Sequence, residues 1–246
     1  MSATEPRLRF EAVSKRFGGT LAVDDVSASV AAGEVYGLIG PNGSGKTTLM
    51  NLVSGFYPPD SGAIVLDGQH LERRRAHEMA ALGVVRTFQL PRAFGSLSVL
   101  DNLLVPLTAD HRRESLAALR SQAGEALVWT GLEQLAAALA STLSGGQTML
   151  LQLARALMHE PVRLLLLDEP FAGVAPAIKE RMIGTVQRLN RERGATVVLV
   201  SHELATVRQL CTRVGVMNAG RLIAEGPLAA VAARPEVVDA YLGRPV

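Results

Sequence analysis

Apolar and polar side chains alternate along two segments near the start of the chain, residues 8–13 and residues 23–30. A period of two residues is typical of a strand that packs one face on a core and exposes the other face to water. Residues 35–39 form a short apolar run, which predicts a buried strand. We therefore expect two antiparallel strands, separated by a turn at residues 15–19, beside a first buried strand.

A second apolar run covers residues 162–167 almost continuously and ends at Asp168 and Glu169. A strand without a polar face must be covered on both sides, as in the centre of a parallel sheet. Residues 195–200 form another apolar run of strand length. These runs predict an α/β core.

Helical periodicity replaces the strand pattern between residues 98 and 140. The residues expected along one face of this stretch are Leu116, Leu119, Ala123, Leu127 and Thr130. We interpret residues from about 90 to 154 as a helical subdomain inserted into an α/β core of residues 1–89 and 155–246.

The remaining elements are shorter and alternate between the two types. Further helices are expected at residues 77–82, 149–158, 176–193 and 235–241, with another that begins at 201–203. Further strands are expected at residues 63–66, 83–89, 214–217 and 221–224. All these elements are expected to form a single domain of residues 1–246.

Composition narrows the class of protein. Hydrophobic residues make up 48% of the 246 positions and charged residues 20%, as in an ordinary soluble α/β protein. Because no apolar run approaches the roughly 18 residues of a membrane span, and residues 1–5 do not begin a secretion signal, we expect a location inside the cell. A net charge of +2, with no basic cluster longer than residues 73–75, argues against a nucleic-acid partner. The single cysteine, Cys211, is expected to be buried and inert in a helix.

Residues 40–48, with the sequence GPNGSGKTT, match the phosphate-binding pattern G-x-x-x-x-G-K-[ST] in full. Glycines allow the backbone N–H groups of such a loop to point inward at a pyrophosphate, and the helix expected from about Lys46 adds a favourable partial charge. The nucleotide-binding residues predicted here are Asn42, Gly43, Ser44, Gly45, Lys46, Thr47 and Thr48. The order strand, loop and helix disfavours the alternative of a glycine-rich turn that binds nothing.

Two side chains of this loop have specific expected roles. Lys46 is expected to reach the β- and γ-phosphates of ATP, and the Thr47 hydroxyl to bind Mg²⁺. Asp168 and Glu169 follow the apolar strand at its carboxyl end, where open α/β sheets bind their ligands. Asp168 is expected to hold Mg²⁺ through water, and Glu169 to accept a proton from the attacking water or to orient it.

Other polar features remain ambiguous on local sequence alone. Ser144, followed by two glycines before an apolar-periodic helix, offers a second anion-binding surface, but a helix cap without a ligand fits the same residues. Phe17 could stack on a purine or pack in the core. His202 follows the strand at 195–200 at the same sheet edge, where a capping or packing histidine is equally consistent.

The order of these motifs along the chain resembles the ATP-binding subunits of ABC transporters, and the resemblance covers essentially the whole sequence. It implies a P-loop ATPase core with an antiparallel β subdomain and a helical subdomain, and ATP hydrolysis as the activity. It also implies roles for three residues: Phe17 would stack on adenine, Gln89 would sense Mg²⁺ and the attacking water, and His202 would contact the γ-phosphate.

The same resemblance implies a dimer that encloses two ATP molecules. Residues 143–147, with the sequence LSGGQ, are similar to the signature motif of the family. The signature residues expected to bind nucleotide are Ser144, Gly146 and Gln147. Those of one subunit would face the γ-phosphate held by Lys46 of the other.

Finer similarities, at residues 15–19, 55–62, 86–89 and 223–243, are to ATPases of branched-chain amino acid importers. They imply a peripheral subunit on the cytoplasmic face of the cell membrane. Its implied partners are two transmembrane permease subunits, a sister ATPase or a second copy of this chain, and, indirectly, an extracytoplasmic solute-binding protein.

Three alternatives stay open. Residues 168–174 also resemble the ATPase of lipopolysaccharide exporters. A soluble ABC ATPase acting on DNA or ribosomes would require a coiled coil, a zinc site or a second ATPase domain, and a regulator without turnover would not need Glu169 and His202. Ala175 stands where many ABC ATPases carry Asp or Asn, which leaves the symmetry and rate of hydrolysis open.

Overall fold

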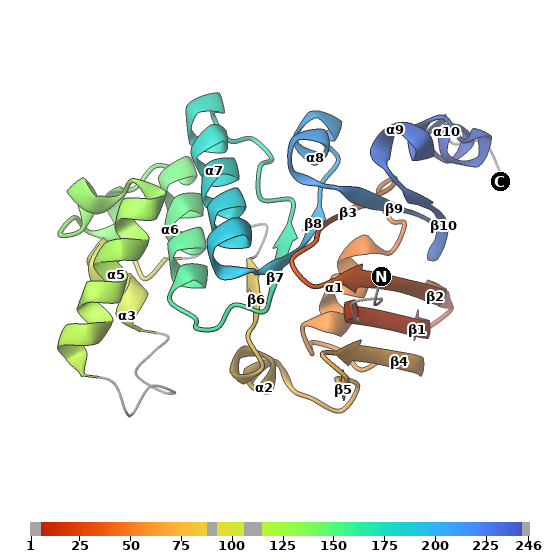
Figure 1. The fold of residues 1–246 in the computed structure, drawn as a ribbon, viewed down its shortest axis with the longest axis horizontal. Coiled ribbons are helices and arrows are strands. Elements are labelled where there is room, and N and C mark those ends of the chain that lie inside the picture. Colours follow the sequence, from red (N-terminus) through yellow and green to blue (C-terminus); the bar gives the residue numbers. More distant parts are fainter. Residues whose placement is uncertain (1–5, 88–92, 106–114, 243–246) are drawn as a thin grey trace.

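The computed structural model describes residues 6–87, 93–105 and 115–242, which form two sheets and a set of helices (Figure 1). The larger sheet has six strands in the spatial order β10 (Arg221–Gly226), β9 (Arg213–Asn218), β3 (Val35–Ile39), β8 (Thr196–Val200), β7 (Leu164–Asp168) and β6 (Val84–Thr87). All its neighbours pair in parallel except β9 and β10, which are antiparallel. The α/β core expected from the apolar runs is confirmed.

The smaller sheet is antiparallel and has four strands, in the order β2 (Thr20–Ala31), β1 (Pro6–Phe17), β4 (Ser61–Leu66) and β5 (Gln69–His70). The predicted turn at residues 15–19 is wrong in extent. Lys15, Arg16 and Phe17 still pair with β2, so only Gly18 and Gly19 form the turn. A two-residue loop lets the strand pairing continue to the tip of the hairpin.

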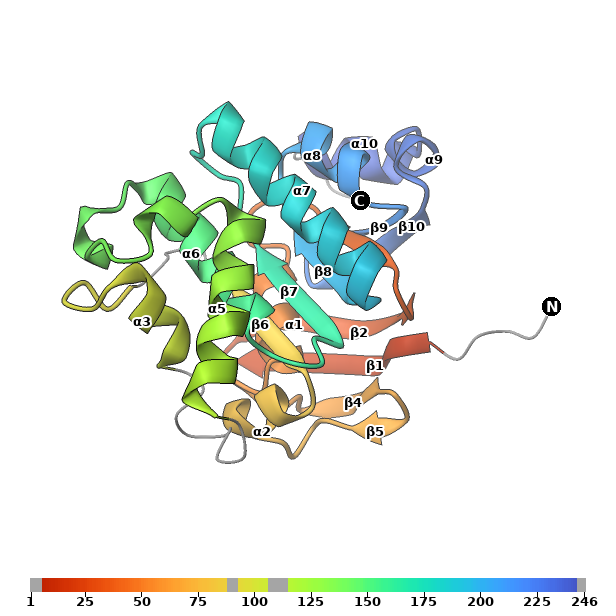
Figure 2. The same cartoon turned by 60° about the vertical axis from the view of Figure 1, so that its left-hand side comes forward.

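The helices fall between the strands and after them. They are α1 (Lys46–Val53), α2 (Ala76–Ala81), α3 (Val99–Leu104), α5 (Leu116–Thr130), α6 (Gly145–Leu157), α7 (Pro176–Arg193), α8 (Leu204–Leu210), α9 (Leu228–Ala232) and α10 (Pro235–Leu242). In both views α3, α5 and α6 gather at one end of the molecule, away from the antiparallel sheet (Figures 1 and 2).

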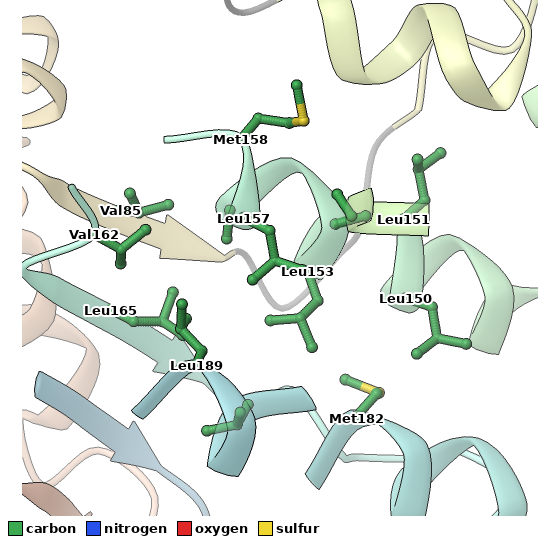
Figure 3. Packing of buried hydrophobic residues seen from close by; sticks show 14 of the residues in the cluster. Val85, Leu150, Leu151, Leu153, Leu157, Met158, Val162, Leu165, Met182 and Leu189 are labelled. Carbon is green, nitrogen blue, oxygen red and sulfur yellow. The ribbon is translucent and has the colours of Figure 1, made fainter. Parts of the chain in front are cut away.

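Alternating side chains of the central strands supply two different cores. Leu164 and Leu166 belong to a cluster that includes α1 and the antiparallel sheet. Leu165 and Leu167 belong to a second cluster, which includes α5, α6 and α7 (Figure 3). Because successive side chains of a strand point to opposite faces, this alternation explains why the strand has to be apolar throughout.

The helical face predicted on α5 is confirmed at Leu119, Ala123, Leu127 and Thr130, which are all buried. Leu116 is an exception, with 58% of its surface exposed. It is the first residue of the helix, after the N-cap Ser115, and the packed face begins one turn later.

Some boundaries differ from the sequence pattern: for example, α8 begins at Leu204, after the expected start at residues 201–203, and Glu203 is its N-cap. Helix α6 begins at Gly145, earlier than the predicted residue 149, because the Ser144 side chain caps it. Cys211 is half-buried at the C-cap of α8 and not within the helix. Helix α9 was not predicted, since its five residues are too few to establish a period. The division of the chain near residues 90 and 154 stays a prediction.

Candidate active site

The phosphate-binding loop, the pair Asp168 and Glu169, and His202 follow three neighbouring strands, β3, β7 and β8. These strands run in parallel, so their carboxyl ends lie at one edge of the sheet. The loop after β3 is the phosphate-binding pattern, while β7 ends at Asp168 and β8 precedes His202. A cleft open to solvent follows this edge; its lining residues are Thr20, Leu21, Ala22, Asn42, Gly43, Ser44, Gly45, Lys46, Thr47, Thr48, Glu169, Val200, Ala219 and Gly220.

The glycine at the end of the loop has a backbone that other residues rarely adopt. Gly45 has a φ of 103° and is the N-cap of α1. A Cβ atom at this position would lie 2.3 Å from the carbonyl oxygen of Ala22, a backbone atom of β2. Gly45 therefore lets the loop pass close to the hairpin and leads directly into the helix N-terminus, where backbone N–H groups are available to an anion.

The ammonium group of Lys46 is held by its own loop. Its Nζ lies 2.8 Å from the carbonyl oxygens of both Gly40 and Pro41, and 3.3 Å from the Ser44 Oγ. Burial lowers the pKa of this ammonium, while the charges of Glu169 and Asp168 act in the opposite direction. Lys46 thus lies among the residues that line the cleft, with its ammonium held by the loop, and its contact with phosphate stays a prediction.

Asp168 and Thr47 lie together, as expected for a shared metal ion. The Thr47 Oγ1 is 3.5 Å from the Asp168 Oδ1. Among the described residues no group of three or more His, Cys, Asp or Glu could hold a metal by itself. A hydroxyl and one carboxylate fit Mg²⁺, a hard cation that prefers oxygen ligands and completes its shell with water and substrate phosphates.

Glu169 and His202 contact each other. The His202 Nδ1 lies 2.9 Å from the Glu169 Oε2, and the side chains are 61% and 16% exposed, respectively. Glu169 also has a φ of 49°, a conformation that is uncommon for non-glycine residues. Its N–H donates to the carbonyl oxygen of Val200, 2.9 Å away, which fixes the backbone after β7 against β8. The carboxylate is thereby held beside the cleft.

The signature residues do not join this cluster. Ser144 caps α6: its Oγ accepts the N–H of Gln147, and the Gln147 Oε1 accepts the N–H of Ser144. Ser144 is thus the N-cap of α6, and this role leaves its predicted contact with nucleotide untested. None of residues 144–147 lines the cleft of the described part of the chain, and Ser144 is exposed to solvent. The structure thus places the signature residues apart from the cleft of their own chain, and their contact with nucleotide stays a prediction.

Phe17 stands at the tip of the hairpin, with 42% of its surface exposed. Its ring meets that of Tyr57 edge to face, with centroids 5.3 Å apart. The ring is thus not part of the core, and its predicted stacking on a purine stays a prediction. Gln89, the other predicted contact of Mg²⁺ and water, lies outside the described residues.

The sequence interpretation missed one residue of the site, Arg86 on β6. Its Nη2 lies 3.0 Å from the Asp168 Oδ2, and both side chains are almost fully buried. An arginine within a short buried strand was the available signal, but its partner follows only from the pairing of β6 with β7.

Comparison with known proteins finds relatives over nearly the whole chain. The sequence profile of the ABC transporter family matches residues 23–172. The high-affinity branched-chain amino acid transport ATP-binding protein BraF of Pseudomonas aeruginosa is 36% identical over 256 residues, which cover 98% of this chain and 99% of BraF.

Solved structures agree with the fold. An ATP-binding cassette of an ABC transporter in its ADP conformation is 34% identical, with a TM-score of 0.86 over 98% of this chain and 100% of the cassette. A dimeric cassette in a post-hydrolysis state, bound to ADP and Pi, is 27% identical, with a TM-score of 0.80 over 90% of this chain and 98% of that cassette.

Proposed function

This chain belongs to the ABC transporter family as an ATP-binding and ATP-hydrolysing subunit, and we propose that it powers the import of branched-chain amino acids or similar small polar solutes. The observation that carries the proposal is the 36% identity with BraF, which extends over 98% of the chain. BraF is named for the transport of branched-chain amino acids.

The proposed nucleotide contacts follow from the cleft. Lys46 binds the β- and γ-phosphates with the loop of residues 42–48, and Phe17 stacks on the adenine. Thr47 and Asp168 hold Mg²⁺, which neutralises the negative charge of the phosphate oxygens when it is bound. Gln89 is proposed to contact the metal and the attacking water.

The proposed hydrolytic step depends on Glu169 and His202. Glu169 accepts a proton from water as the water oxygen bonds to the γ-phosphorus, and the bond to the oxygen bridging the β- and γ-phosphates breaks. The products are ADP and phosphate. His202, whose Nδ1 lies 2.9 Å from the Glu169 carboxylate, keeps that group oriented and contacts the γ-phosphate.

A dimer would complete each site. Ser144, Gly146 and Gln147 of a second subunit are proposed to close over the ATP bound by Lys46, because they lie outside the cleft of their own chain. ATP then holds two subunits together and its hydrolysis releases them, which can drive membrane subunits between two conformations. The cassette related at 27% identity is dimeric, in a post-hydrolysis state bound to ADP and Pi.

The described residues contain no helix that is both long and apolar enough to cross a bilayer. We propose peripheral attachment at the cytoplasmic face of a membrane, through two permease subunits. An extracytoplasmic solute-binding protein would act on them from the other side. The second ATPase of the complex is either a sister chain or a second copy of this one.

Co-purification tests the proposed assembly. The tagged chain is extracted from its native membrane in mild detergent, and the proteins that accompany it are identified by mass spectrometry. Recovery of two polytopic subunits with a second ATPase supports the importer assembly. Recovery of lipopolysaccharide-export subunits, or of nucleic acid and ribosomal proteins, would overturn it while leaving the ATPase chemistry unaffected.

Uptake measurements test the solute. Cells that lack this chain are complemented with the native sequence or with Glu169→Gln at matched expression, and the uptake of labelled leucine is compared with that of lysine. We expect leucine uptake to be restored only by the native chain and lysine uptake to be unchanged. Equal leucine uptake with both sequences would contradict the proposal.

A further inference from the structure

Arg86 lies at the centre of a buried polar cluster beneath the nucleotide cleft. One end of its guanidinium, Nη1, donates to the Asn51 Oδ1 at 2.6 Å and to the Ser54 Oγ at 2.8 Å. The other end, Nη2, donates to the Asp168 Oδ2 at 3.0 Å. The exposed fractions of the Arg86 and Asp168 side chains are 8% and 7%.

The cluster joins three elements that the phosphate and metal chemistry requires. Asn51 lies on α1, the helix that starts with Lys46 and Thr47, and Ser54 is the C-cap of that helix. Asp168 ends β7, and Arg86 lies on the neighbouring edge strand β6. A planar guanidinium with fixed donors can hold these groups at set angles, which a flexible ammonium cannot do.

The two oxygens of Asp168 have different neighbours. Oδ2 accepts the hydrogen bond from Arg86, whereas Oδ1 faces the Thr47 hydroxyl at 3.5 Å. A carboxylate can rotate about its terminal bond, so an unheld Asp168 would have no fixed direction. The contact with Arg86 selects the orientation in which Oδ1 points to the hydroxyl that begins α1.

We propose that Arg86 is a positioning residue for the metal: it holds one oxygen of Asp168 so that the other oxygen faces Thr47, and thereby sets how tightly Mg²⁺ binds with ATP. This inference rests on the proposed metal role of Thr47 and Asp168. It assigns to Arg86 a function distinct from phosphate binding, since the guanidinium lies below the cleft and does not line it.

The test measures Mg²⁺ binding and not turnover. ATP binding is followed by fluorescence of a labelled ATP analogue in a Glu169→Gln background, first in EDTA and then as Mg²⁺ is added. Loss of a group that orients a metal ligand typically lowers metal affinity about 10- to 100-fold. We expect Arg86→Met to raise the half-saturating Mg²⁺ concentration by about that factor and to leave the affinity measured in EDTA unchanged.

Two further variants should raise the half-saturating Mg²⁺ concentration by smaller amounts. Arg86→Lys keeps the positive charge but loses the planar guanidinium with its fixed donors. Its Mg²⁺ requirement should therefore lie between those of the native chain and Arg86→Met. Asn51→Ala removes an anchor of the guanidinium while Asp168 keeps its partner, so it tests the inference even where Arg86→Met does not fold. Its Mg²⁺ requirement should also rise. An unchanged requirement in both Arg86→Lys and Asn51→Ala would overturn the inference.

Arg213 provides the matched control. It pairs with Glu34 and Glu225 at the opposite end of the strands, where Arg213 is aligned with Tyr36 near the start of β3. Arg213→Met removes a paired guanidinium of the same kind without touching Asp168, so it should not change the Mg²⁺ requirement. If Arg86→Met weakened ATP binding equally with and without Mg²⁺, Arg86 would be merely structural and the inference wrong.

Asp168→Asn separates this inference from the one on which it depends. If Mg²⁺ strengthens ATP binding in the native chain but not in Asp168→Asn, the metal role of Asp168 stands. An unchanged response in Arg86→Met would then refute only the positioning role. If Asp168→Asn itself responds to Mg²⁺ like the native chain, the assignment of Asp168 as a metal-binding residue fails first.

Discussion

Replacing Gly45 by alanine should damage the phosphate loop in a way that Gly43→Ala does not. Both glycines have positive φ values, 103° at Gly45 and 79° at Gly43. They differ in the space around them: a Cβ at Gly45 would lie 2.3 Å from the Ala22 carbonyl oxygen, whereas one at Gly43 would meet nothing within 4 Å. The pair therefore separates backbone strain from steric overlap.

The expected losses of stability follow from backbone strain and steric overlap. A left-handed backbone costs an L residue about 1–2 kcal/mol, and this applies to both variants. Overlap with a backbone atom that cannot move freely adds about 1–3 kcal/mol, and this applies to Gly45→Ala alone. We expect Gly45→Ala to unfold at a temperature roughly 2–12 °C below that of Gly43→Ala, given about 2–4 °C per kcal/mol for a chain of this size.

Thermal unfolding followed by circular dichroism, without nucleotide, measures this difference directly. ATP affinity by calorimetry provides a second readout, because moving the loop away from β2 displaces the N–H groups that begin α1. If the two variants melt at the same temperature, the close approach of Gly45 to Ala22 does not constrain the loop, and the explanation for this glycine is wrong.

Three other predictions concern single side chains. Glu169→Gln should keep ATP binding, lose about 10²- to 10⁴-fold in hydrolysis and elute as an ATP-dependent dimer in size-exclusion chromatography; a monomer with normal turnover would contradict its assignment as the general base. Lys46→Ala should weaken ATP binding about 10- to 150-fold, since a charge-assisted contact contributes about 1.5–3 kcal/mol, and an unchanged dissociation constant by calorimetry would refute this contact. Burial raises the pKa of the Cys211 thiol to about 12. Alkylation by iodoacetamide at pH 8 should therefore be about a thousandfold slower in the folded protein than in urea, where the pKa is about 8.5 and far more thiolate is present; equal rates would show that the thiol is accessible.

Features that depend on residues adjacent in the sequence were predicted well. The bounds of α7, Pro176–Arg193, agree with the sequence pattern because a proline opens the helix and Gly194 ends it in a left-handed conformation. The strand at residues 35–39 was equally clear, since a short apolar run before a glycine-rich loop has few alternative structures. These signals are local, so they do not depend on which strands become neighbours.

Features that depend on the order of the strands were not predicted. The contact of Arg86 with Asp168 requires β6 to lie beside β7, and the contact of Glu169 with His202 requires β7 beside β8. No periodicity along the chain encodes these pairings. Leu116 shows that a correct helical period does not guarantee burial. It lies on the predicted face of α5, but the packed part of that face begins one turn later.

The leucine layer between α6 and the central sheet has a mechanical consequence. Leu153 and Leu157 of α6 share one cluster with Leu165 of β7 and Leu189 of α7 (Figure 3). Close-packed interiors have low compressibility, so a displacement of α6 toward the sheet cannot be taken up by compressing the side chains between the helix and the strand. Either the strand that ends at Asp168 moves with the helix, or the whole layer slips to a new packing. Unless the layer repacks, a displacement of α6 is therefore transmitted to the end of β7 that carries Asp168.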